Sequence, residues 1–228
     1  MNQLLGNIQI SVNPNLYLKN PESSSLGKRI LEGGVPLIEE LGFENFTFKK
    51  LAANIGSTEA SIYRYFESKH KFLLYLNSWY WSWMEYRFIL VTTNIDDPNI
   101  RLKNAIKLLM EEVVEDGSIP HINEILLHRI LISESSTAYT TKSVDEANKL
   151  GAYRKYKQLV QRICDIILEI NPSYKYPHML ISTVIEGGHH QRFFSEHLPR
   201  LTDILEGEDA IVTFYTQLVF QAISDDEK

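Results

Sequence analysis

The chain has 228 residues, a formal net charge of −6, 44% hydrophobic residues and one cysteine. A chain of this length can bury a sizeable core. The single cysteine excludes an intrachain disulfide and a cysteine-rich metal site. No stretch reaches the ~20 apolar residues of a membrane span, and the first residues lack the basic and apolar regions of a signal peptide. We therefore expect a cytoplasmic protein with no membrane partner.

The acidity belongs to the C-terminal part of the chain. Residues 26–72 hold seven Lys/Arg against six Asp/Glu, a balance of +1, whereas residues 73–228 hold 15 against 22, a balance of −7. An acidic bulk domain does not prevent a small neutral-to-basic head from binding nucleic acid. Net charge therefore decides nothing about DNA binding.

The first 25 residues are expected to form an extension, either disordered or draped over the body, because they contain two prolines, several asparagines and a serine run. Ser24 or Ser25 suits the N-cap of a helix that ends at Gly42. The GGVP sequence at 33–36 predicts a kink or local break inside this helix, since proline removes a backbone donor and crowds the preceding turn.

Two short helices and a long one follow. The expected ranges are 47–54, with Thr47 as N-cap, then 58–66, and a long helix over 68–92, with Gly56 supplying the turn between the first two. Two short helices joined by a tight glycine turn and packed on a longer helix make a helix-turn-helix. The predicted head therefore covers 26–72.

The remaining residues, 73–228, also predict helices separated by capping and turn residues. Their expected ranges are 99–115, 120–134, 143–170, 175–196 and 207–223. No strand alternation and no internal repeat is visible. The predicted fold is all-α, a three-helix helix-turn-helix head followed by a larger helical-bundle domain.

Residues 42–74, GFENFTFKKLAANIGSTEASIYRYFESKHKFLL, resemble the DNA-binding head of the TetR/AcrR family of transcriptional regulators. The matching features occur in order and at the family's spacing: GF at 42–43, Thr47, LA at 51–52, Gly56, IYRYF at 62–66 and Ser68-Lys69. The resemblance implies a transcriptional regulator. The expected type is a repressor that a small, mostly apolar molecule releases from a palindromic double-stranded DNA operator.

In a helix-turn-helix the second helix lies in the major groove and its N-terminal residues reach base edges. Here these residues are Thr58, Glu59, Ala60 and Ser61. Ile62 and Phe66, an i,i+4 pair, are expected to face the core. The expected phosphate contacts are Thr47, Tyr63, Arg64, Tyr65 and Lys69. An alternative is that the aromatic side chains only form a small core and the charges a solvated face.

The segment departs from the family pattern at three positions. The family commonly has a hydrophobic residue at 57, Lys at 59 and Gly at 60, where this chain has Ser57, Glu59 and Ala60. Glu59 either accepts a hydrogen bond from cytosine N4 in the major groove, or is favoured by the helix dipole without a base contact. We leave both roles open.

By the resemblance, the C-terminal domain forms a homodimer through the last two helices, 175–196 and 207–223, and binds the effector. The last helix carries an apolar face of Phe214, Leu218, Phe220 and Ile223. Packing of this face within its own domain is the alternative.

An effector pocket is expected among the middle helices, where aromatic residues are dense. Tryptophan and tyrosine combine an apolar body with one polar group, which suits a mostly apolar ligand. The candidate residues are Trp79, Trp83, Met110, His128, Tyr153, Tyr156 and His189. If these side chains only fill the core, the protein is instead an architectural or ligand-independent DNA-binding protein with the same head.

The GGHHQRFF segment at 187–194 raises the question of a metal site. Adjacent His189 and His190 point to different helix faces, and only Glu186 and His190 have a ligand spacing. The chain also has no phosphate loop, HExxH sequence or nucleophile elbow. We therefore expect no metal, no cofactor and no enzymatic activity.

Overall fold

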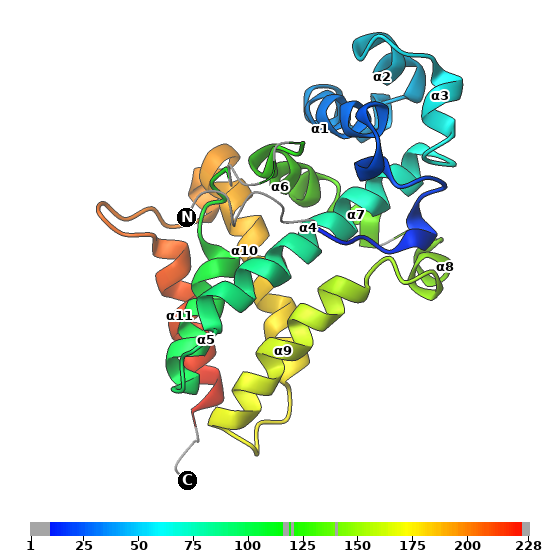
Figure 1. Ribbon diagram of the computed structural model, residues 1–228. Coiled ribbons are helices and arrows are strands. Elements are labelled where there is room, and N and C mark those ends of the chain that lie inside the picture. Colours follow the sequence, from blue (N-terminus) through cyan, green and yellow to red (C-terminus); the bar gives the residue numbers. More distant parts are fainter. Residues whose placement is uncertain (1–9, 116–118, 120, 140, 225–228) are drawn as a thin grey trace, which may run out of the picture. The chain divides into compact units, whose positions relative to one another are not determined.

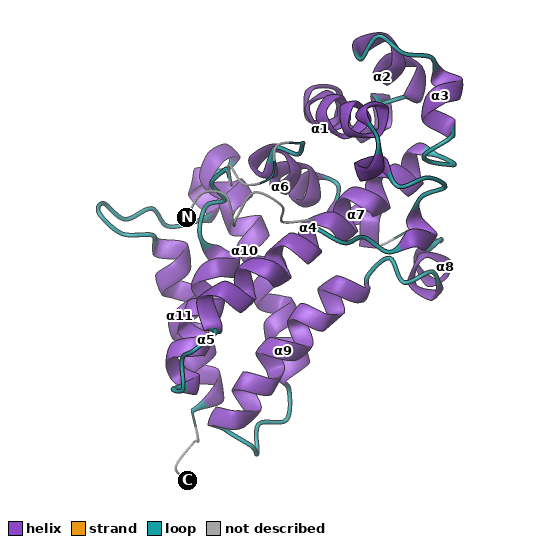
Figure 2. Cartoon of the chain, in the orientation of Figure 1, coloured by secondary structure: helices purple, strands orange, loops and turns teal. Residues whose placement is uncertain are grey.

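The computed structural model describes residues 10–115, 119, 121–139 and 141–224. Over these residues the chain is helical and has no strand (Figure 1, Figure 2), as predicted. It divides into two compact units, one of Met1–Trp83 with Val113–Lys155 and one of Met84–Glu112 with Tyr156–Lys228. No helix in the described ranges has the length and apolar character needed to cross a membrane.

The first unit contains the whole of the predicted head. Its elements are η1 Pro14–Leu16, η2 Pro21–Ser23, α1 Ser25–Asn45, α2 Phe48–Asn54, α3 Glu59–Tyr63, most of α4 Lys69–Thr92, α6 Glu124–Ser133, α7 Ser135–Tyr139 and α8 Val144–Lys149. The helices α1, α2 and α3 lie together in Figure 1, and α2 contacts both of the others. The predicted caps Ser24 and Thr47 and the turn at Gly56, where φ is +61°, are confirmed.

The expected break near Gly33 and Gly34 is wrong. The α1 helix is continuous there, and its one residue with non-helical dihedral angles is Gly42, with φ 72° and ψ 153°. The two glycines instead make room for neighbours: a Cβ on Gly33 would collide with Ile55 Cγ2, and one on Gly34 with the ring of Phe72. Glycine is therefore used here for close packing, not for a bend.

The described part of the N-terminal extension is draped over its own unit, one of the two predicted alternatives. Leu18 N donates a hydrogen bond to Tyr65 O at 2.7 Å, and Asn13 Nδ2 donates to Leu150 O at 2.8 Å. Leu16 is fully buried. Residues 10–24 are thus fixed to the first unit by backbone, side-chain and apolar contacts, while residues 1–9 lie outside the described ranges.

The second unit contains the end of α4, α5 Pro98–Met110, most of α9 Arg154–Ile170, α10 Pro177–His197, η3 Pro199–Leu201 and α11 Ala210–Ile223. The helices α5, α10 and α11 contact one another. Gly187 and Gly188 permit this, since a Cβ at either position would collide with Tyr215 or with Met110. These glycines therefore allow close helix approach.

Several predicted helices are shorter than expected. The expected helix over 143–170 is two helices, α8 and α9, because Gly151 adopts φ +82° between them. The helix expected over 99–115 ends at Met110, and the one expected over 120–134 begins at Glu124 after its N-cap Asn123. The helix expected over 58–66 ends at Tyr63.

Candidate nucleic-acid interface

The second short helix, α3, is held by an apolar core beneath it. Ile62 and Phe66 are fully buried, as predicted. The ring of Phe66 packs edge-on against Phe72 of α4, with 4.9 Å between ring centroids. The ring of Phe48 of α2 also packs edge-on against Phe72, with 6.4 Å between centroids. Because residues of α2 and α4 pack into this core, they fix the orientation of α3. The side of α3 opposite Ile62 therefore faces solvent.

Small hydroxyl side chains lie at the N-termini of both short helices. Thr58 Oγ1 accepts a hydrogen bond from Ser61 N at 3.3 Å and lies 2.8 Å from Ser61 Oγ. Thr47 Oγ1 accepts from Lys50 N at 3.2 Å. Thr47, Thr58 and Ala60 are exposed and Ser61 is half-buried. A hydroxyl that accepts a backbone N–H keeps its own proton to donate, so Thr47 can still serve a phosphate oxygen.

Two further candidates lie at the C-terminal end of α3. Tyr63 is 47% exposed, and its ring packs edge-on against Phe48 with 5.1 Å between ring centroids. Arg64 is exposed at the C-cap of the helix. The sequence reasoning missed Lys49, which is exposed on α2; its position in the KK pair at the start of that helix was the available signal.

The expectation that Tyr65 faces outward is wrong, since its side chain is 3% exposed. The chain turns directly after α3, and the N-terminal extension covers the ring. The Tyr65 hydroxyl lies 2.7 Å from Ser24 Oγ, and Lys19 Nζ lies 5.2 Å from the ring centroid. Tyr65 therefore joins the extension to the head and does not point at a phosphate.

The expectation that Lys69 contacts a phosphate is also corrected. Its Nζ donates to the carbonyl oxygens of Phe43 and Glu44, each at 2.8 Å, and of Phe46 at 3.1 Å. These carbonyls belong to the end of α1 and the turn after it, where a cation is favoured. All three ammonium protons are used within the head, which ties the start of α4 to the end of α1.

Glu59 is half-buried in the first turn of α3. The helix dipole favours a carboxylate at this position whether or not DNA is bound. The side chain also lies beside the exposed Thr58 and Ala60, so the geometry is compatible with both predicted roles.

Four of the predicted effector residues lie in the first unit and are engaged with its core. Trp79 and Trp83 are 1% and 0% exposed and stack with 6.5 Å between ring centroids. His128 Nδ1 lies 2.8 Å from the hydroxyl of Tyr80. Tyr153 donates its hydroxyl proton to Ala138 O at 2.6 Å.

The other three predicted effector residues lie in the second unit. Met110 and His189 are buried. The Tyr156 hydroxyl donates to Glu186 Oε1 at 3.4 Å. Burial raises the pKa of the Glu186 carboxyl, while this hydrogen bond and the nearby His190 oppose the rise. None of the seven residues lines either of two surface cavities, one at the N-terminal extension and one between α10 and α11.

The head matches a known protein family. Residues 30–76 match the family model described as bacterial regulatory proteins, tetR family. The HTH-type transcriptional regulator YuxN of Bacillus subtilis (strain 168) is 23% identical over 158 residues, which cover 64% of this chain and 53% of YuxN. The chain thus spans about half the length of the curated relative it matches.

Solved structures share the fold over most of the chain. AibR, in complex with isovaleryl coenzyme A and operator DNA, is 14% identical with a TM-score of 0.55, covering 89% of this chain and 97% of AibR. The superantigen PfiT is 16% identical with a TM-score of 0.58 and the same coverages. Identities this low show the fold alone, and one fold serves unrelated functions. The matching sequence and the capped helix-turn-helix therefore show that the head, residues 30–76, is that of the tetR family of bacterial regulatory proteins.

Proposed function

We propose that this protein is a homodimeric, DNA-binding transcriptional repressor, acting in the cytoplasm, that leaves its operator when a small, mostly apolar molecule binds. The observation that carries the proposal is the exposed rim of α2 and α3, with Thr47, Thr58, Tyr63 and Arg64 on a rigid aromatic core. Hydroxyls and a guanidinium at these positions suit phosphates, which set the register of a helix in the major groove.

Base reading is assigned to the first turn of α3. Thr58, Ala60 and Ser61 have short side chains, which let the backbone approach the groove closely, and Glu59 is the one residue there that carries a charge. Arg64 at the C-cap of α3 and Lys49 on α2 supply exposed positive charge to the head. The site therefore combines few base contacts with several phosphate contacts, a division common to DNA-binding proteins.

The dimer interface is assigned to α10 and α11, which expose apolar side chains to solvent. Met179 and Phe214 are 68% and 56% exposed, and Phe193 and Leu218 are each 37% exposed. Clusters of exposed apolar residues on a folded domain mark interaction surfaces. A second copy of the chain is the partner that the family's operator symmetry requires, because two heads read two half-sites.

A ligand-independent, architectural DNA-binding protein is the second candidate. It is favoured by the packing of the aromatic cluster in the first unit. The Tyr139 hydroxyl accepts hydrogen bonds from Asn77 Nδ2 and Trp81 Nε1, each at 2.7 Å. These two bonds engage the amide nitrogen of Asn77 and the indole nitrogen of Trp81 within the cluster, so neither donor is available to a small molecule in that unit.

Operator release separates the two candidates. A duplex selected from genomic fragments is bound to the protein and titrated with a panel of apolar and amphipathic small molecules, while fluorescence anisotropy reports bound DNA. A repressor releases the specific duplex with at least one compound, and the same compound raises the thermal midpoint of the free protein. Specific DNA binding that no compound of a broad panel changes would favour the architectural protein.

A further inference from the structure

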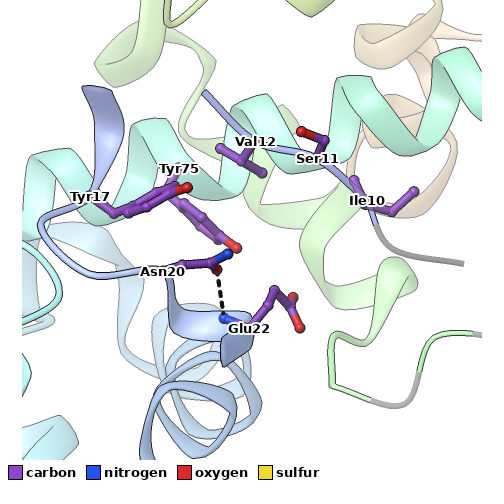
Figure 3. A pocket seen from close by; sticks show the side chains of 7 residues that line it. All are labelled: Ile10, Ser11, Val12, Tyr17, Asn20, Glu22 and Tyr75. Carbon is purple, nitrogen blue, oxygen red and sulfur yellow. Dashed lines mark hydrogen bonds between the residues drawn. The ribbon is translucent and has the colours of Figure 1, made fainter. Parts of the chain in front are cut away.

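A cavity of about 180 Å³ lies between the N-terminal extension and α4, and none of the predicted effector residues lines it. Figure 3 shows its lining, which consists of Ile10, Ser11, Val12, Tyr17, Asn20, Glu22 and Tyr75. Six of these residues come from the extension and one from α4. The cavity therefore exists only because the extension is folded against the first unit.

The side chains divide the cavity into a polar part and an apolar part. The polar part is made by Tyr17, Asn20, Glu22 and Tyr75. The more apolar part is made by Ile10 and Val12, with Ser11 between them (Figure 3). Asn20 Oδ1 already accepts a hydrogen bond from the backbone N–H of Glu22 at 2.9 Å, which holds the Asn20 side chain at the cavity edge (Figure 3). The rings of Tyr17 and Tyr75 meet edge-on with 6.0 Å between centroids.

Glu22 carries the charge of this cavity. Within the described residues its carboxylate forms neither a hydrogen bond nor an ion pair. Burial raises the pKa of Glu22, and the charges of His121 and Lys28 oppose that rise. His121 is itself engaged by Glu32, with 3.0 Å between Nδ1 and Oε1. A half-buried carboxylate without a close cation carries a desolvation cost that a bound cation would remove.

We propose that this cavity binds a small organic cation, a guanidinium or primary ammonium group on a short hydrocarbon chain. Glu22 accepts the N–H groups of the cation, since charge-assisted bonds to a carboxylate are the strongest that a polar side chain offers. The faces of Tyr17 and Tyr75 favour the same charge through cation–π attraction. Ile10 and Val12 receive the hydrocarbon, because they form the apolar end of the cavity.

The size of the cavity limits the ligand. At ~30 Å³ per water molecule, the volume of about 180 Å³ corresponds to roughly six waters. That excludes large amphipathic molecules and admits a guanidinium with a chain of a few carbons. The small cation proposed for this cavity also differs in chemistry from the mostly apolar effector of the proposed function. The two proposals are therefore independent of each other.

The cavity adjoins the DNA-reading helix through the extension. Between the cavity residue Tyr17 and η2, Leu18 N bonds to Tyr65 O, and Ser24, one residue after η2, bonds to the Tyr65 hydroxyl. A cation that bridges Glu22 to α4 would hold this segment in the conformation that covers Tyr65. The ligand would therefore stabilise the folded head.

Isothermal titration calorimetry in phosphate buffer tests the proposal with the matched pair butylguanidine and butylurea. The two molecules have nearly the same shape and differ in charge. The full chain is expected to bind butylguanidine at least tenfold more tightly than butylurea. Glu22→Gln, which keeps the side-chain shape and removes the charge, should weaken butylguanidine at least tenfold. Glu40→Gln, on the exposed side of α1, is the matched control and should leave the affinity unchanged.

A second variant keeps the test decisive if Glu22→Gln perturbs folding. Tyr17→Leu removes one aromatic face of the cavity and leaves Glu22 in place, so it should weaken butylguanidine at least threefold. Three results would each contradict the proposal. They are equal affinity for the two ligands, an equal loss of butylguanidine affinity in Glu22→Gln and Glu40→Gln, and no heat of binding from the folded protein. None of these outcomes depends on DNA binding, so the repressor function is tested separately.

Discussion

Replacing Lys69 by methionine is expected to destabilise the protein without changing its charge contacts to DNA. Methionine keeps most of the aliphatic stem and removes the ammonium group. Three hydrogen bonds are lost, to the carbonyls of Phe43, Glu44 and Phe46. Each bond to a charged donor is worth about 1.5–3 kcal/mol when fully buried. Lys69 is half-buried, so water satisfies part of the loss.

The expected decrease in the free energy of unfolding is about 2 kcal/mol, the value of one buried charge-assisted bond. Urea titrations followed by circular dichroism measure it, at one fixed protein concentration because a dimer's stability depends on concentration. Lys49→Met is the matched control. Lys49 is exposed on α2, so its replacement should change the free energy of unfolding by about 0.5 kcal/mol or less.

DNA binding supplies the contrasting measurement for the same pair. The slope of log affinity against log salt counts neutralised phosphates, at about 0.9 per contact. Lys69→Met should keep the wild-type slope, whereas Lys49→Met should lower its magnitude if Lys49 faces a phosphate. Unchanged stability together with a smaller slope in Lys69→Met would refute the capping role and restore the phosphate contact.

Three further perturbations test other parts of the account. Arg64→Ala should weaken binding to all duplexes alike and reduce the salt slope by about 0.9; loss at one base position only would contradict a phosphate contact. Glu59→Lys should change base preference if Glu59 reads cytosine, and a uniform gain on every sequence would show only a removed repulsion. Because burial raises the pKa of Glu22, this carboxyl stabilises the fold at low pH, and the contribution is lost as pH rises through the folded pKa. Glu22→Gln should therefore lose less stability than the wild type between about pH 4 and pH 7, and parallel stability curves would contradict the raised pKa.

Local sequence chemistry predicted the head well because its signals act over a few residues. The cap Thr47 binds the N–H three residues on, and Gly56 supplies a left-handed turn that needs no distant partner. The inward positions of Ile62 and Phe66 follow from helical spacing alone. The same reasoning gave the all-α fold, since capping residues separate apolar helical segments throughout.

Side-chain partners far along the chain were not predictable in this way. Tyr65 is buried by Ser24 and by the extension, and the bond that shows this joins residues 41 positions apart. Lys69 reaches carbonyls 23 to 26 positions earlier. Gly34 has a helix-breaking propensity, but the approach of Phe72 decides its role. In each case tertiary packing overrides a local preference.

The most direct test of the central claim is a comparison of two duplexes. One is the site selected from genomic DNA, and the other is a scrambled duplex of the same length and composition. Fluorescence anisotropy at physiological salt should show the selected duplex bound ~10³-fold or more tightly, by two copies of the chain on a near-palindromic sequence. Equal affinity for the two duplexes would contradict the assignment of α3 as a reading helix.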